Sequence, residues 1–424
     1  MVLLSSWLWA FSCASYALGK ATLGERDFTA LSADDLKLLS EQPDPSRHLD
    51  STNPVSHLTK ILIPRAPGTD NNTFVRNYII QTLDKLGWTI ELDSFNASTP
   101  VGARPFTNVI ATKDPEAPRR LVVAAHFDSK FFSSYPENQF LGATDSAAPC
   151  AIMLDLAQTL DPLLTARDAR VLADTLPPTE DLDAAETTLQ LIFFDGEEAF
   201  HDWTDDDSIY GARHLAENWE STGLAPSMLN KRRFMRPGAP TTPLSLIEHL
   251  VLLDLLGSPH PQIRSYFPDT AWLFDSLISA EDALLSANII GGEGGAGGGG
   301  AGLGRESFFK PRSAGERAIG YMGDDHVPFL KRGVSVLHVI AEPFPRVWHT
   351  LGDDASALHL PTLRRWNLIM RVFLVQYLGL HPEDGKNVRR EEPEMVGFAD
   401  VDEIVTGRAE SDLVSGFVGC MGLE

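Results

Sequence analysis

Short apolar runs alternate with longer amphipathic segments along most of the chain. Four continuous apolar runs predict strands buried on both faces of a sheet, because they are too short for typical helices. They are Leu121–Ala125, Leu191–Phe194, Leu250–Asp254 and Val334–Ile340. Two further strands are expected nearer the N-terminus, at Thr89–Phe95, which alternates as an edge strand does, and at Phe106–Thr112.

Apolar residues at helical spacing predict helices around these strands. Gly87 favours the C-terminal end of one helix, and Pro361 suits the first turn of another. The expected helices are Phe74–Leu86, Ala147–Leu160, Tyr210–Trp219, Thr270–Ala287, Pro361–Leu378 and a short helix that ends at Arg332. Residues 20–70 read as an approach segment, and the polar stretch Asp161–Asp183 as a surface loop.

The alternation of strands and helices predicts an α/β fold with a largely parallel sheet. The length of 424 residues permits two or three domains, but a single large domain accounts for the whole pattern. A net charge of -23 and a pI near 4.9 argue against nucleic acid or an anionic membrane as a partner, because both attract basic surfaces.

The N-terminus reads as a secretory signal peptide over residues 1–19. It is apolar, uncharged before Lys20, and ends in small-x-small cleavage sites, although the basic n-region is absent. The alternative is an uncleaved signal that anchors the chain in the ER or Golgi lumen. No later segment is expected to cross a membrane. Sequons at Asn71 and Asn96 are compatible with a secreted glycoprotein.

Two other regions stand apart in composition. The glycine-rich stretch 291–304 predicts a flexible loop, because it lacks the preceding strand and the Lys-Ser/Thr ending of a phosphate-binding loop. Residues 385–424 form an acidic tail whose composition is typical of disorder. Cysteine is scarce: Cys13 lies in the expected signal, and Cys150 and Cys420 are expected to be free thiols, with a bridge between them as the alternative.

Candidate chemistry begins with two adjacent glutamates. Glu197 and Glu198 follow the strand Leu191–Phe194, after a turn that Gly196 permits. In an open α/β sheet, ligands bind outside the carboxyl ends of the strands. Neighbouring side chains that leave a strand point in different directions, so one glutamate can hold a metal while the other moves protons. The alternative is an acidic helix start, where carboxylates are favoured.

Other strand ends repeat this pattern. His126 and Asp128 follow one strand, Asp254 ends another, and His349 follows the last after a longer loop. Asp145, which precedes a helix and has an N-cap as its alternative role, and Asp324 complete the set. Carboxylates with a few histidines suit a catalytic zinc, which takes about three protein ligands and leaves one position open. Any one of these residues is ordinary, but several buried acids at one sheet edge are not, because unpaired buried carboxylates are costly.

Six segments in matching order resemble the glutaminyl-peptide cyclotransferases of animals and fungi, which belong to the M28 zinc-aminopeptidase clan. They are HFDSK, GATDSAAPCAIMLDLA, LIFFDGEEAF, LLDLLG, GYMGDDHVPFLKRGVSVLHVI and PFPRVWHT. The resemblance spans residues 60–380. It implies a single domain, with a mixed sheet flanked by helices, over residues 20–384.

The resemblance also implies roles for individual residues. One zinc per chain would be held by Asp145, Glu198 and His349. Glu197 would be the general acid and base. Asp254 and Asp324 would be its partner acids, and the substrate pocket would be lined by Trp203, Phe344 and Trp348. For each of these aromatic residues, core packing is the alternative.

The implied reaction is the cyclisation of an N-terminal glutamine of a peptide or protein to pyroglutamate, with N-terminal glutamate as a second candidate substrate. The alternative functions are a secreted zinc aminopeptidase of the same clan and a non-catalytic binding protein with this fold. Trp203, Asp324 and Trp348 favour the cyclotransferase, and a monomer is expected. The histidine equivalent to His126 binds a second zinc in the dinuclear aminopeptidases, but it is no ligand of the single zinc in the cyclotransferases, so the resemblance leaves His126 out of the metal set. Animal cyclotransferases bridge two cysteines where this chain has Ala125 and Cys150, so Cys150 lacks that partner.

Overall fold

A six-stranded mixed sheet forms the centre of the computed structural model, which describes residues 25–173, 175–176, 181–226, 241–291, 306–312 and 322–387. The strands are β1 (Thr89–Thr99), β2 (Gly102–Thr112), β3 (Arg119–His126), β4 (Thr187–Phe194), β5 (Ile247–Asp254) and β6 (Val336–Ile340). Their order across the sheet is β1-β2-β4-β3-β5-β6. The last four pair in parallel, whereas β1 and β2 are antiparallel, so the prediction of a mixed, largely parallel sheet is confirmed.

Alternate residues of the parallel strands enter two separate cores, because side chains along a strand point to opposite faces. On β3, Val123 packs into the larger core and Val122 into the smaller one. On β4, Phe193 packs into the larger core and Phe194 into the smaller one. All of these side chains are buried, and the parallel strands are therefore continuous apolar runs in the sequence.

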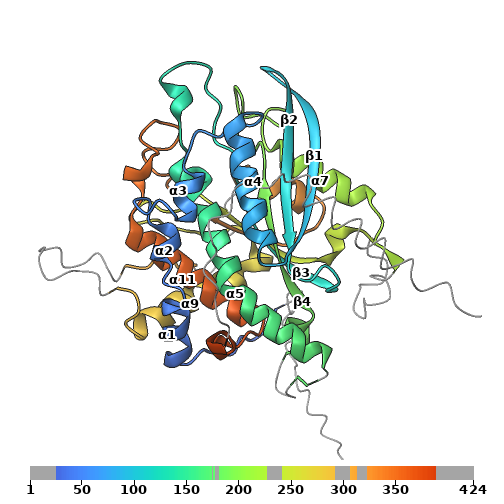
Figure 1. Cartoon of the computed structure of the whole chain (residues 1–424), viewed down its shortest axis with the longest axis vertical. Coiled ribbons are helices and arrows are strands. Elements are labelled where there is room, and N and C mark those ends of the chain that lie inside the picture. Colours follow the sequence, from blue (N-terminus) through green and yellow to red (C-terminus); the bar gives the residue numbers. More distant parts are fainter. Residues whose placement is uncertain are drawn as a thin grey trace, which may run out of the picture.

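Helices cover both faces of the sheet (Figure 1). The larger core is shared with α4 (Asp70–Asp84), α5 (Ala148–Leu172), α9 (Ala271–Ser286) and α11 (Leu360–Tyr377), and the smaller core with α7 (Tyr210–Ser221) and α10 (Val327–Leu330). The remaining short helices are α1 (Ala33–Glu41), α2 (Ser46–Leu49), α3 (His57–Ile61) and α6 (Leu182–Ala185). Single 3-10 turns lie at Glu137–Gln139, Pro243–Leu246, Pro268–Thr270, Ala355–Ala357 and Pro382–Asn387.

The approach segment is more regular than expected, because α1, α2 and α3 lie within it. Polar side chains tie these helices to the larger core. Arg371 on α11 is wholly buried and donates to Asp155 on α5 (2.5 Å) and to the carbonyl oxygen of Leu39 on α1 (2.6 Å). His57 on α3 lies between the hydroxyl of Tyr78 (2.7 Å) and the side-chain oxygen of Gln158 (3.1 Å).

The prediction of a surface loop at Asp161–Asp183 is wrong over the first half of that range. Helix α5 continues to Leu172 with Pro162 inside it. Leu163, Leu164 and Arg167 are buried beyond the proline, and Nη1 of Arg167 donates to the carbonyl oxygen of Thr187 (2.8 Å). This tertiary packing outweighs the roughly 3 kcal/mol that a proline costs inside a helix.

By length and composition, one helical stretch could cross a membrane, contrary to the expectation from the sequence. It is Glu137–Leu172, whose most apolar window has a mean hydropathy of 1.2 and is 94% buried inside the molecule, as the core helix of a globular protein can be. Cys150 lies in the same stretch, is buried, and forms no disulfide with another described residue. The signal segment, most of the glycine-rich loop, the tail from residue 388, Cys13 and Cys420 lie outside the described residues.

The carboxyl ends of β3, β4, β5 and β6 lie at one edge of the sheet, since these strands are parallel and adjacent. His126 ends β3, Asp254 ends β5, and Glu197 follows β4. The fold therefore gathers the polar strand-end residues on one side of the molecule.

Candidate active site

Three side chains at this edge form a group that could hold a metal ion. Ligand atoms of Asp145, Glu198 and His349 all lie within 4.8 Å of one another. Nε2 of His349 is 3.4 Å from Oδ2 of Asp145 and 3.3 Å from Oε2 of Glu198. Oδ2 of Asp145 and Oε1 of Glu198 are buried and accept no hydrogen bond from any described residue. Orphaned carboxylate oxygens beside an imidazole fit a divalent cation such as zinc, since buried carboxylates need a partner.

The loop that presents Asp145 depends on glycine. Gly142 has a φ of 55°, and a Cβ there would lie 2.2 Å from the carbonyl oxygen of Asp145. The carboxylate of Asp145 turns away from α5, whose N-cap is Ala147, and contacts His126 and His349 instead. The N-cap alternative for Asp145 is therefore wrong.

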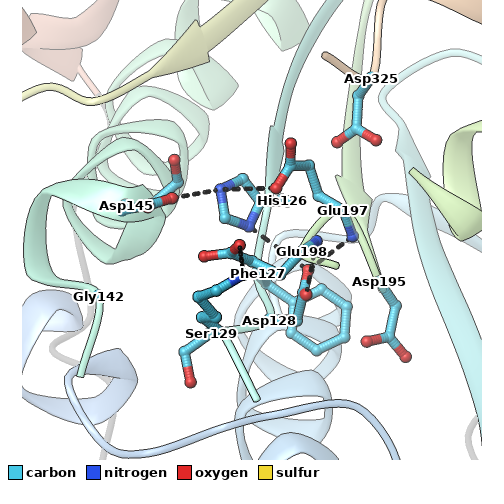
Figure 2. A network of polar contacts seen from close by, with 12 residues as sticks. His126, Phe127, Asp128, Ser129, Gly142, Asp145, Asp195, Glu197, Glu198 and Asp325 are labelled. Carbon is cyan, nitrogen blue, oxygen red and sulfur yellow. Dashed lines mark hydrogen bonds and ion pairs between the residues drawn. The ribbon is translucent and has the colours of Figure 1, made fainter. Parts of the chain in front are cut away.

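Glu197 and Glu198 are separated by the turn that follows β4. Gly196 has a φ of 80°, and a Cβ there would lie 2.4 Å from the ring of Phe106. The backbone amides of Glu197 and Glu198 donate to the two oxygens of Asp128 (3.2 and 3.3 Å). Figure 2 shows Asp128 beside this backbone, with the two glutamate side chains leaving in different directions.

The two glutamates consequently face different partners. Glu198 approaches His349 and accepts from Nζ of Lys130 (3.4 Å), whereas Oε2 of Glu197 lies 4.0 Å from Nε2 of His126. Glu198 is only 2% exposed and Glu197 only 7% exposed, and the next described helix begins at Tyr210. An acidic helix start is therefore the wrong interpretation of this pair.

His126 joins the acids on both sides of the site. Its Nε2 lies 3.0 Å from Oδ1 of Asp145, and its Nδ1 lies 3.4 Å from Oδ1 of Asp128 (Figure 2). Its Nε2 also lies 3.5 Å from Oδ1 of Asp254. Burial lowers the pKa of His126, but the surrounding carboxylates, Glu197 foremost, raise it well above the ordinary value. His126, Asp145 and Asp254 also form a second group with the spacing of metal ligands.

Asp254 and Asp324 have different electrostatic environments. Burial and the charge of Asp324 raise the pKa of Asp254 to about 6, against the hydrogen bond from His126. Asp254 also accepts from the hydroxyl of Ser146. Burial opposes ionisation of Asp324 as well, but His338, 2.7 Å away, lowers the pKa of Asp324 below its usual range. Asp324, His326 and His338 form a third group with metal-ligand spacing.

Glu197 is a buried acid whose proton affinity the site raises strongly. Burial raises its pKa well above the ordinary value, the charges of Asp324 and Glu198 add to this, and His126 opposes it. In contrast, burial lowers the pKa of His349, but the adjacent carboxylates of Asp145 and Glu198 raise it to about 9. The site can thus keep a proton on a carboxyl group beside a cation-attracting trio.

Three aromatic side chains border this arrangement. Trp348 stacks on the ring of His349 at 3.8 Å, and Phe344 meets Trp348 edge-on at 5.0 Å. Trp203 lies over Gly323. A Cβ added to Gly323 would be 3.2 Å from Nε1 of Trp203. Trp203 and Trp348 are 46% and 40% exposed, so neither is a core residue.

All nine site residues predicted from the sequence thus lie at or beside one edge of the sheet. The sequence pattern included Asp128 as a strand-end acid without a role, and the prediction missed the other residues that hold the site, namely Lys130, Ser146, His338 and Asp353. Asp128, Lys130 and Ser146 lie inside the same motifs as predicted residues, which was an available signal. No signal in the sequence connects His338 with Asp324, because that contact depends on the path of β6.

The chain is similar to known proteins over most of its length. The sequence model of peptidase family M28 matches residues 108–290 and 304–374. A glutaminyl-peptide cyclotransferase-like protein of Bos taurus is 45% identical over 325 residues, which are 76% of this chain and 74% of the relative. A protein of the same description from Mus musculus is 42% identical over 354 residues, or 83% and 80% of the two chains. The crystal structure of Macrostomum lignano glutaminyl cyclase matches with a TM-score of 0.66 at 33% identity, and covers 84% of this chain and 97% of that one.

Proposed function

Because this chain belongs to the glutaminyl-peptide cyclotransferases of peptidase family M28, we propose that it converts the N-terminal glutamine of peptides and proteins to pyroglutamate. The α-amine forms a bond to the side-chain amide carbon, the bond from that carbon to its nitrogen breaks, and ammonia leaves. No water is consumed. An N-terminal glutamate is a second possible substrate, and its reaction would release water instead.

Asp145, Glu198 and His349 are the residues we assign to one zinc ion per chain. The orphaned oxygens of the two carboxylates support this assignment. When bound, zinc supplies a Lewis acid that polarises the side-chain carbonyl oxygen of the substrate. His126 is not included among the ligands, because it is grouped with Asp145 and Asp254 and not with Glu198 and His349.

Glu197 is the residue that we propose moves the proton. It would accept a proton from the α-amine and deliver the proton to the departing amide nitrogen. This role needs a carboxyl group that accepts a proton near neutral pH, and burial together with Asp324 and Glu198 raises the pKa of Glu197 in that direction. The position of this buried carboxyl group beside the metal-binding trio carries the proposal most directly.

Asp324 and Asp254 are assigned to positioning around Glu197. The lowered pKa of Asp324 keeps it ionised, so it can accept hydrogen bonds from the substrate amide. Asp254, with a pKa of about 6, lies between Ser146 and His126 and can share a proton with its neighbours. Trp203, Phe344 and Trp348 would surround the glutamine side chain and limit the access of water.

A secreted zinc aminopeptidase is the alternative that the relatives disfavour. The proteins at 40–45% identity are named glutaminyl-peptide cyclotransferases or cyclotransferase-like proteins. We further propose a domain over residues 20–384 after a signal peptide at 1–19, an acidic tail at 385–424, a secretory or secreted location with glycosylation, and a monomer. The sequence features given above support these assignments.

Zinc-dependent release of ammonia from a peptide that begins with glutamine tests the proposal. The protein should release ammonia, lose this activity after treatment with a chelator, and regain it when zinc is returned. His349→Ala should stay inactive after zinc is added, because one of the three ligands is missing. Turnover that persists in the metal-free protein, or a fully zinc-loaded His349→Ala variant, would contradict the assignment.

A further inference from the structure

Two of the proposed zinc ligands come from connections that are far apart in the sequence. Asp145 lies between β3 and α5, and His349 lies between β6 and α11. A zinc ion needs both side chains at a fixed separation, since its ligand distances vary little. The side chain that joins the two connections is Asp353.

Asp353 is buried and bonds directly to the residues beside Asp145. Its Oδ1 accepts from the backbone amide and from the hydroxyl of Thr144, both at 2.9 Å. The amide of Ala143 donates to the carbonyl oxygen of Asp353 (3.0 Å). On its own segment, the amide of Asp353 donates to the carbonyl oxygen of Thr350 (2.9 Å), the residue after His349.

Both ligand segments need such support. His349 has a φ of 55°, a left-handed conformation that costs a residue with a side chain about 1–3 kcal/mol. The Asp145 loop is held on its other side by Arg65, whose guanidinium donates to the carbonyl oxygens of Leu141 and Gly142. Arg65 and Asp353 therefore hold the Asp145 loop from both sides, and the hydrogen bonds of Asp353 connect this loop to the His349 segment.

The second carboxylate oxygen of Asp353 indicates that folding stability alone does not explain why an aspartate occupies this position. Oδ2 is buried and accepts no hydrogen bond from any described residue, which is costly for folding alone. Burial and the charge of Asp145 raise the pKa of Asp353 to about 7, which is a further sign of an unfavourable environment.

We propose that Asp353 is a positioning residue that sets the separation of Asp145 and His349 and thereby the affinity of the site for zinc. The inference rests on the proposed function, because it takes the zinc ligands from there. Groups that orient metal ligands commonly contribute about 10–100-fold to affinity.

The test is the zinc dissociation constant, measured in the full-length protein by competition with a coloured chelator at one pH. Asp353→Ala should bind zinc about 10–100-fold more weakly. Asp353→Asn should stay close to the wild type, because an amide oxygen can still accept from Thr144. Thr144→Val, which keeps the shape and loses only the hydroxyl, should fall between them. Cobalt substituted for zinc should give an altered absorption spectrum in Asp353→Ala.

Asp93→Ala is the matched control. Asp93 is a buried acceptor on β1 that bonds to Asn108 and His214, outside both connections. This variant should lower the thermal midpoint and leave the zinc dissociation constant unchanged. An unchanged constant in Asp353→Ala, or an equal loss in Asp93→Ala, would overturn the inference. If Asp353→Ala does not fold, Thr144→Val takes its place, and an unchanged zinc dissociation constant in that variant would overturn the inference. A wild-type protein that binds no zinc would instead remove the proposed function itself.

Discussion

At the scale of single residues, Asp128 holds the turn from which the side chains of Glu197 and Glu198 reach different partners. Both backbone amides donate to its carboxylate, which fixes the turn, so that one side chain joins Asp145 and His349 and the other points toward His126. The sequence predicts two acids at a strand end, but which acid faces the metal came from the family resemblance. The structure adds Asp128 as the residue that holds this turn.

The substitution Glu197→Gln separates these roles. It should lower kcat by about 10²–10⁴-fold, because a glutamine cannot carry the proton. Zinc should stay bound at the wild-type stoichiometry, since Glu197 is outside the proposed ligand set. Glu198→Gln is the matched control, with the same change one residue away, and it should lose zinc. Retained cyclisation in Glu197→Gln would remove its assignment as the proton carrier.

At the scale of elements, the loop between Phe200 and Asp207 is organised by one carboxylate. Asp207 accepts from the amides of Phe200 (3.0 Å), His201 (2.9 Å) and Asp202 (3.2 Å) and from the hydroxyl of Tyr210 (2.8 Å). This loop carries Trp203 beside Gly323. The carboxylate therefore holds a proposed wall of the substrate pocket.

Asp207→Asn should raise KM for a glutamine peptide on the order of tenfold, because the amide has only one acceptor oxygen and bonds to a charged acceptor contribute about 1.5–3 kcal/mol. The value of kcat should change little, since Trp203, in its proposed role, would contact the substrate equally in the ground state and the transition state. Asp206→Asn removes a charge from the neighbouring exposed residue and should leave KM unchanged. A fall in kcat at constant KM would show that the loop serves the chemistry instead.

Helix α3 introduces a pH dependence of folding through His57. Burial, with a further contribution from His48, lowers the pKa of His57 to about 3 in the folded protein, against about 6.5 in an unfolded chain. Below this pH the unfolded state therefore binds a proton at His57 that the folded state does not bind. The free energy of unfolding falls as the pH drops below about 6.5. At pH 5 this ionisation should account for about 2 kcal/mol of lost stability.

Unfolding in urea at pH 7 and pH 5 measures this contribution. His57→Gln, which cannot take up the proton, should lose less stability over this interval than the wild type, by about 2 kcal/mol. His201→Gln is the control, because the ring of His201 is 76% exposed. An equal loss of stability in His57→Gln and the wild type would mean that His57 is not the source.

The elements themselves were largely predictable from periodicity. The strand runs and most helices were expected within a few residues, because continuous apolar runs and helical spacing report burial directly. The extension of α5 past Pro162 was not, since it depends on Arg167 reaching the backbone of β4. Helices α1 to α3 were also missed, because side chains on distant helices, such as Arg371, hold them in place.

At the scale of the whole molecule, the parallel strands explain why residues from 126 to 349 meet at one place. Their carboxyl ends share one edge, and the acids that gather there are buried. The predicted set of acids and histidines follows from this topology. The pairings within the set, such as Ser146 with Asp254 and His338 with Asp324, depend on loop paths that one sequence does not specify.

The central claim is that the reaction closes a ring within the substrate and uses no water. Mass spectrometry of a glutamine-initiated peptide, incubated with the zinc-loaded protein in heavy-oxygen water, tests it most directly. The account predicts a product that is lighter by one molecule of ammonia, with an intact peptide chain and no heavy oxygen. Release of the first residue, or a product that contains heavy oxygen, would contradict it and indicate a hydrolase.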